Sequence, residues 1–392
     1  MSSKLILSLF VARYLGFEIL GIYGMIAGAA ALVPVLLRFG IMNSICRDAV
    51  SDAPGALAVN MRHYLKAMAA LYAVLIMAAV IFGFYVENPA IPLLIIGVFA
   101  AEHVAQDLFN LANNLQMPRR ANIIIFASSG LWSLSYMAFA YFHEPARTLE
   151  AILAFWLASA IPALLVAWQF LAPLPWHSAT QKSQPFFHWL FEKIHQSKFL
   201  FAGEFANHAS FYLDRYLIAL LLDLETTGIY ILFWQVGSAV YNLVNAGSMQ
   251  IFSPLLIAAH DQKNTGKFEK TFRSCLVWTT SEAVVISLAA AIAFPLLLRI
   301  ANNPATDAYM GLLYVVLLGQ LVRIGSDLIG FRLHTRRKDK LMSASYVLLF
   351  LLTALFASLG VTLAGVYGAA IATTATYLSI SLFRWHAAGR TQ

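Results

Sequence analysis

Residues 341–383 read LMSASYVLLFLLTALFASLGVTLAGVYGAAIATTATYLSISLF and contain no charged side chain, although Lys340 and Arg384 stand directly on either side. An α-helix rises about 1.5 Å per residue, so about 20 residues cross the roughly 30 Å hydrocarbon layer of a membrane. The segment is therefore long enough for two membrane spans. We place them at 341–359 and 362–383.

Apolar stretches of similar length repeat along the whole chain, each bounded by charge or by proline and glycine. The other long stretches lie at 20–37, 65–86, 90–111, 121–142, 150–171, 199–222, 228–257, 275–298 and 309–330. A shorter run, Leu5 to Ala12, precedes them and would rise only about 12 Å as a helix. We count it as a span, either a half-helix or the remnant of a longer helix. The pattern therefore predicts an all-α polytopic membrane protein with about twelve transmembrane helices.

The composition excludes the soluble classes. Of the 392 residues, 60% are hydrophobic and 11% are charged, and the mean hydropathy is +0.72. Soluble domains are about 45–50% apolar and about 25% charged, so this chain is not a soluble enzyme, a disulfide scaffold or a disordered segment. Cys46 and Cys275 are too far apart in the sequence to form a metal or redox motif.

The basic residues orient the spans, because lysine and arginine concentrate in cytoplasmic loops. With a cytoplasmic N-terminus, only Arg13, Arg147 and Arg299 of the 26 lysines and arginines lie outside, while Arg215 and Arg323 fall within spans. Both termini are then cytoplasmic. The net charge of +7 is explained by this topology and does not indicate nucleic-acid binding.

A short motif occurs twice. Arg13-Tyr14-Leu15 precedes Gly21-Ile22-Tyr23, and Arg215-Tyr216-Leu217 precedes Gly228-Ile229-Tyr230. Six spans separate the two copies, and an even number gives both halves the same orientation, related by an axis along the membrane normal. The polar segment 173–198 lies between them. We therefore predict a six-helix lobe at 1–172, a cytoplasmic linker at 173–198 and a second six-helix lobe at 199–392.

The order of these motifs resembles bacterial polysaccharide flippases of the O-antigen type, which are lipid-linked oligosaccharide transporters of the MOP superfamily. The similar segments are 12–23, 36–47, 213–230, 253–273 and 365–372. The resemblance implies two six-helix lobes related by a pseudo-two-fold axis, as in MATE-like proteins. Family members usually have a longer first helix, so the resemblance also implies a truncated or misassigned N-terminus and leaves the role of Arg13 in doubt.

Several polar side chains lie inside the predicted spans, where a charge costs about 2.5–3.5 kcal/mol at mid-bilayer. At helical spacing, Glu204, His208, Phe211 and Arg215 fall on one face of the span at 199–222. Such faces are typical of a hydrated cavity, and interhelical hydrogen bonds are the alternative. The candidates for binding a coupling ion are Glu204, His208, Asp214, Glu102, His103, Asp107 and Asp327.

Three arginines are candidates for binding a phosphorylated substrate, because guanidinium groups bind phosphate in a bidentate manner. Arg215 is the best placed, Arg13 is its counterpart in the first lobe, and Arg323 is the third. For Arg13 and Arg215 the alternative is a side chain that extends to the membrane interface. Arg323 and Asp327 are four residues apart and favour a neutralising pair. The Asp214 carboxylate is expected to interact with a residue of the span at 228–257 or of the other lobe.

These residues and the resemblance favour translocation of a polyprenyl-pyrophosphate-linked oligosaccharide across the bacterial inner membrane by alternating access, for surface polysaccharide biosynthesis. The sequence contains no catalytic, nucleotide-binding or metal-binding motif, so we expect a transporter with no cofactor, driven by its substrate or coupled to H⁺ or Na⁺. Expected partners are the lipid-linked substrate, membrane lipids, glycosyltransferases and a polysaccharide polymerase.

Two other functions are alternatives to glycan translocation. A cation-coupled multidrug or small-molecule antiporter of the same superfamily would use a net acidic cavity, which Glu102, Asp107, Glu204 and Asp214 could supply. A membrane-embedded glycosyltransferase or polymerase would need a large polar loop or domain for catalysis. The predicted outer loops are short, which disfavours the enzyme.

Overall fold

The computed structural model describes residues 2–49, 54–176, 184–301, 304–335 and 338–389, and all regular secondary structure within these ranges is helical. Eight of the described helices are long and apolar enough to cross a membrane. The prediction of an all-α polytopic membrane protein is confirmed.

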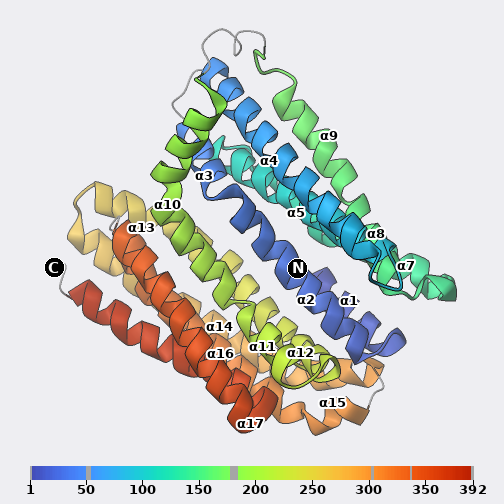
Figure 1. Cartoon of the computed structure of the whole chain (residues 1–392). Helices are drawn as coiled ribbons and strands as arrows, with labels where there is room; N and C mark the ends of the chain where they lie inside the picture. The colour runs from blue at the N-terminus through green and yellow to red at the C-terminus, as the bar shows by residue number, and fades with distance from the viewer. Residues whose placement is uncertain (1, 50–53, 177–183, 302–303, 336–337, 390–392) are drawn as a thin grey trace. The chain divides into compact units, whose positions relative to one another are not determined.

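The described residues of the first half form ten α-helices, most of which are labelled in Figure 1. Their bounds are α1 Ser2–Tyr14, α2 Phe17–Arg38, α3 Ile41–Asp48, α4 Pro54–Gly83, α5 Ala90–Asn114, α6 Pro118–Ile125, α7 Trp132–Phe142, α8 Leu149–Ala158, α9 Ala160–Leu171 and α10 Phe186–Ser210. A π-helical turn, η1 Phe126–Leu131, joins α6 to α7, and a 3₁₀ turn, η2 Glu144–Ala146, follows α7. Helix α10 begins inside the predicted linker, whose residues 177–183 lie outside the described ranges.

The second half continues with α11 Leu213–Leu221, α12 Leu224–Val244, the π-helical turn η4 Asn245–Met249, α13 Gln250–Asp261, α14 Thr265–Ala301, α15 Pro304–Ala308, α16 Met310–Thr335 and α17 Asp339–Gly389. Helices α16 and α17 pack side by side, in orange and red in Figure 1. The uncharged segment 341–383 lies in α17 and forms two helical parts, because Ala364 and Gly365 leave helical geometry. Gly365 has φ +58°, a left-handed conformation that favours glycine.

Every predicted span overlaps one or more of the described helices. The short first run lies in α1, whose 13 residues extend about 20 Å, less than the hydrocarbon thickness. The span at 199–222 is not one continuous helix, because α10 ends at Ser210 and α11 begins at Leu213. Phe211 and Tyr212 form a turn between them.

The chain forms two compact units. Unit 1 contains residues 1–25 and 206–392, and unit 2 contains residues 26–205. In unit 1, α1 packs against α12 and α14. In unit 2, α5 packs against α4, α6, α8 and α9. The boundaries of these units differ from the boundaries of the predicted lobes, because α1 and the start of α2 pack with the C-terminal half of the chain.

The two copies of the Gly-Ile-Tyr motif meet where α2 crosses α12 inside unit 1. A β-carbon on Gly21 of α2 would collide with the carbonyl oxygen of Leu224, and one on Gly228 of α12 would collide with that of Phe17. The two glycines therefore let the backbones of α2 and α12 touch, as small residues commonly do in membrane helices. Next to the crossing, the Tyr216 hydroxyl donates to the Met25 carbonyl over 2.8 Å. The two copies of the motif thus pack against each other.

We expect Gly228→Ala to destabilise the protein, because its methyl group meets backbone that cannot move aside. Overpacking of this kind costs about 1–3 kcal/mol. Gly325→Ala in α16 is the matched control, since a β-carbon there meets no atom within 4 Å. Thermal unfolding of the purified variants in detergent should show a lower midpoint for Gly228→Ala only. Equal midpoints for both variants would contradict the close crossing.

Candidate functional site

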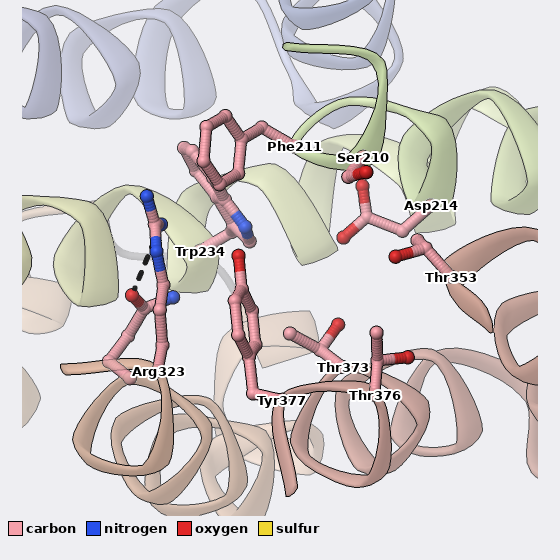
Figure 2. Close-up of a pocket in the computed structure, with 10 residues that line it drawn as sticks. Ser210, Phe211, Asp214, Trp234, Arg323, Thr353, Thr373, Thr376 and Tyr377 are labelled. Atoms are coloured by element: carbon pink, nitrogen blue, oxygen red, sulfur yellow. Dashed lines mark hydrogen bonds between the residues drawn. The ribbon is translucent and has the colours of Figure 1, made fainter. Parts of the chain in front are cut away.

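Unit 1 contains a small buried pocket whose lining comes from five parts of the chain (Figure 2). The lining residues are Ser210, Phe211, Asp214, Trp234, Gln320, Arg323, Thr353, Thr373, Thr376 and Tyr377. Its free volume is about 10 Å³, enough for one water molecule or a small ion. In Figure 2, Arg323 lies on one side, Asp214 and the threonines lie on the other, and Trp234, Phe211 and Tyr377 stand between.

Arg323 supplies the cationic side of the pocket. Its side chain is buried, and its guanidinium carbon lies 3.7 Å from the ring centre of Tyr241 and 4.2 Å from that of Phe211. Desolvated contacts of this kind are worth about 2 kcal/mol or more. The Nη1 atom donates to Gln320 over 3.5 Å, while the Nε atom has no hydrogen-bond partner. The guanidinium group is therefore held mainly by aromatic faces and keeps donor capacity.

The predicted pair of Arg323 and Asp327 is present, but Asp327 has a closer partner. Its carboxylate lies 4.0 Å from Nε of Arg323 and only 3.1 Å from Nη1 of Arg384. It also accepts a hydrogen bond from the Tyr241 hydroxyl over 2.9 Å. One carboxylate thus serves two buried arginines, and Arg323 is left with an incompletely balanced charge.

Sequence reasoning missed Arg384, which was placed in the cytoplasm because it ends the last span. In the structure its side chain is 1% exposed and also donates to the carbonyl and hydroxyl oxygens of Ser326. A β-carbon on Gly330 would lie 3.1 Å from its Nη1 atom. The sequence signal for this burial was Gly330 and Ser326 on α16, since Gly330 leaves room for the arginine and Ser326 accepts its hydrogen bonds.

Arg215 lies beside the pocket and is buried, so it does not extend to the interface as the alternative proposed. Its guanidinium carbon is 3.9 Å from the Trp234 ring centre and 4.8 Å from that of Tyr212, and its Nε and Nη2 atoms have no hydrogen-bond partner. Asp214 accepts from the Tyr230 hydroxyl over 2.5 Å. This bond confirms the expectation that Asp214 holds a residue of the span at 228–257.

Arg13 differs from Arg215 in its surroundings. It lies exposed in the last turn of α1, with its guanidinium carbon 5.3 Å from the Tyr14 ring centre. Arg215 instead lies in the first turn of α11. The structure therefore does not place the two arginines in equivalent positions.

A second polar cluster lies in unit 2. Arg38 of α2 contacts the Glu204 carboxylate of α10, and its Nη1 atom lies 3.6 Å from Asp107 of α5. Asn43 donates to Glu204 over 2.6 Å, and His103 lies 3.3 Å from Asp107. The structure thus gathers three predicted ion-binding candidates around an arginine that sequence reasoning had placed in a cytoplasmic loop.

The other two candidates lie apart from this cluster. Glu102 faces α8 and accepts a hydrogen bond from Trp156 Nε1 over 2.8 Å. His208 lies half-buried near the end of α10, within unit 1, whereas Glu204 belongs to unit 2. The predicted face joining Glu204 to Arg215 is therefore wrong, because the helix is interrupted between them.

No protein-family model matches this chain, and no curated protein matches it in sequence. Solved structures do match it over nearly its whole length. A lipid II flippase, MurJ, in an inward closed conformation matches with TM-score 0.76 and 13% identity, over 98% of this chain and 84% of the flippase. The chain therefore shares the fold of this flippase. A multidrug resistance MATE family transporter of the MOP superfamily, in an inward-facing conformation, matches with TM-score 0.74 and 12% identity, over 99% of this chain and 93% of the transporter.

A second MATE structure, in a bent conformation, matches with TM-score 0.59 and 13% identity, over 100% of this chain and 92% of that protein. At identities this low, the matches establish a shared fold and leave the substrate open. The pseudo-two-fold arrangement of two helical lobes predicted from the repeated motif agrees with this fold. The similar structures are transporters and a flippase, in line with the absence of catalytic motifs in the sequence.

We expect Arg384→Met to destabilise unit 1, because Asp327 would lose its closest cationic partner. A hydrogen bond to a charged group is worth about 1.5–3 kcal/mol. The double variant Arg384→Met/Asp327→Asn should recover part of the loss, since it removes the stranded carboxylate as well. Lys340→Met, at an exposed position of α17, is the control. If the decreases in thermal midpoint of the two single variants simply add up in the double variant, the two side chains do not interact.

Proposed function

We propose that this protein translocates a polyprenyl-pyrophosphate-linked oligosaccharide across the bacterial cytoplasmic membrane by alternating access. The observation that carries the proposal is Arg323, a buried guanidinium group that shares the Asp327 carboxylate with Arg384 and lines a pocket. A diphosphate head group supplies the negative charge that this arginine lacks. The fold supports the proposal, because one structure that shares it is a lipid II flippase.

The aromatic lining fits the same substrate. Phe211, Trp234 and Tyr377 line the pocket between Arg323 and the hydroxyl-bearing residues. Ring faces pack against the apolar faces of sugars, while hydroxyl groups hydrogen-bond to their polar edges. The pocket now holds only about 10 Å³, so a head group would enter as the pocket opens. A ligand drives such a change by binding the open state more tightly.

The membrane arrangement follows from the positive-inside distribution of the sequence. We propose that the protein lies in the inner membrane with both termini in the cytoplasm. Glycosyltransferases that build the glycan and a polymerase that extends it are the expected partners. The driving force is either the substrate gradient or coupling to H⁺ or Na⁺. The candidates for coupling are the buried carboxylates of Asp214 and Asp107 and the half-buried carboxylate of Glu204.

A multidrug or small-molecule antiporter is the second candidate, favoured by the MATE structures that share the fold and by Asp214 in the pocket. Deleting the gene distinguishes the two functions. Loss of surface polysaccharide with unchanged drug susceptibility supports the flippase. Drug hypersensitivity with normal polysaccharide supports the antiporter.

We expect Arg323→Ala and Arg215→Ala to lower surface glycan about tenfold or more in a strain whose chromosomal copy is deleted, because each removes a charge-assisted contact worth about 1.5–3 kcal/mol. The lysine variants should keep partial activity, since lysine preserves the charge and loses the planar fork. Arg47→Ala is the control at an exposed arginine. Glycan is compared at equal amounts of inserted protein, and normal glycan in Arg323→Ala would remove that residue from the mechanism.

A further inference from the structure

The polar cluster of unit 2 has an unbalanced charge. Arg38, His103 and Asp107 are almost completely buried, and Glu204 is half-buried. With a neutral imidazole, the cluster holds two carboxylates and one guanidinium group, a net charge of −1. An isolated charge is costly to bury. One additional proton would neutralise the cluster.

The hydrogen bonds fix one proton on the imidazole. The Tyr64 hydroxyl donates its single hydrogen to Asp107 over 2.5 Å. The Tyr64 oxygen also lies 2.9 Å from Nε2 of His103, so in that contact it must accept. The Nε2 atom therefore carries hydrogen, and it faces an oxygen of Asp107 at 3.3 Å as well. The position left open for a proton on the ring is Nδ1.

The surroundings of Nδ1 satisfy both of its protonation states. Nδ1 lies 3.0 Å from the Tyr72 hydroxyl, and that hydroxyl also lies 3.2 Å from the Phe99 carbonyl oxygen. When Nδ1 is bare, Tyr72 donates to it. When Nδ1 carries hydrogen, it donates to the Tyr72 oxygen, and Tyr72 turns its own hydrogen to Phe99. Neither state needs a side chain to move.

We propose that Nδ1 of His103 is a proton-binding site that couples proton movement to transport in this protein. The proton binds the nitrogen lone pair, no other bond breaks, and the cluster becomes neutral. Its coupling role rests on the proposed transport function, whereas proton binding stands on the geometry alone.

The consequence for the cluster is a competition for Asp107. A protonated His103 attracts the carboxylate that Arg38 approaches at 3.6 Å without a hydrogen bond. Arg38 then relies on Glu204, which Asn43 also holds. A proton on His103 thus changes the electrostatic interactions of Arg38 with Glu204. Glu204 belongs to α10, whose residues contribute to both units.

Apart from the carboxylates of the cluster, the titratable groups around His103 are already hydrogen-bonded or stay protonated. Tyr64 and Tyr72 of α4 take part as hydroxyl groups. On α3, Cys46 experiences the charges of Asp107 and Arg38, and burial raises the pKa of its thiol to about 12, so it stays protonated. Glu102, next along α5, is bonded to Trp156 on α8.

The direct test is nitrogen NMR of ¹⁵N-histidine-labelled protein in lipid nanodiscs. The chain has ten histidines, and the signals of His103 are identified by their absence in His103→Gln. We expect Nε2 alone to carry hydrogen at pH 8.5 and both nitrogens to carry it at pH 5.5. A ring that stays singly protonated at pH 5.5 would overturn the site, and this measurement uses the unmodified chain.

A charge variant tests the cause. Asp107→Asn removes the adjacent anion, so the ratio of doubly to singly protonated His103 at pH 6 should fall at least about tenfold, since a charge within about 4–6 Å alters proton affinity by about tenfold or more. Glu150→Gln is the control, because Glu150 of α8 accepts a hydrogen bond from Asn88, which lies just before the start of α5. Equal fractions in both variants would contradict the role of Asp107.

The coupling role has a separate readout in the glycan assay. We expect His103→Gln, at equal inserted protein, to give at least about tenfold less surface glycan than the unmodified chain. Normal glycan in this variant would overturn coupling while leaving the proposed function in place. Normal glycan in the deletion strain would instead remove the proposed function, with the NMR result unaffected.

Discussion

A charge inside a membrane protein must find its partner within the protein, because hydrocarbon supplies no water. This constraint explains the placement of the buried arginines. Arg38 lies between two carboxylates, Arg384 against Asp327 and Ser326, and Arg323 between aromatic rings. The charge in each cluster is not fully balanced. Unit 2 has an excess of carboxylate, whereas the buried groups at and beside the pocket of unit 1 comprise three guanidinium groups and two carboxylates, which are Arg215, Arg323, Arg384, Asp214 and Asp327. These two imbalances are the chemical basis of the proposed proton site and of the proposed anionic substrate.

Helix positions were readable from the sequence because the membrane imposes a long apolar run on each span. Gly21 and Gly228 were also recognised as a repeat, and the structure shows the reason: their backbones cross. The kink at Gly365 separates two spans that contain no charge between them. What could not be read was the packing of α1 with the C-terminal half, since this depends on contacts between distant parts of the chain.

The candidate sites were only partly predictable for a similar reason. Arg323, Asp327 and Asp214 were found because charge inside an apolar span is conspicuous, and all three meet at or beside one pocket. Arg38 and Arg384 stand at the ends of spans, where positive charge is expected in loops, and the sequence does not tell which way such a side chain turns. The helical face drawn through Glu204 and Arg215 was wrong, because the helix is interrupted at Phe211 and Tyr212.

The central claim is that the guanidinium group of Arg323 recognises the diphosphate of a lipid-linked glycan. Purified protein in liposomes, loaded with a labelled short-chain polyprenyl-pyrophosphate sugar in the inner leaflet, tests it most directly through cleavage by an external glycosidase. The account predicts that the unmodified chain and Arg47→Ala expose the sugar at the same rate, while Arg323→Ala, inserted equally, does so at least about tenfold more slowly. Equal rates for all three proteins would contradict it.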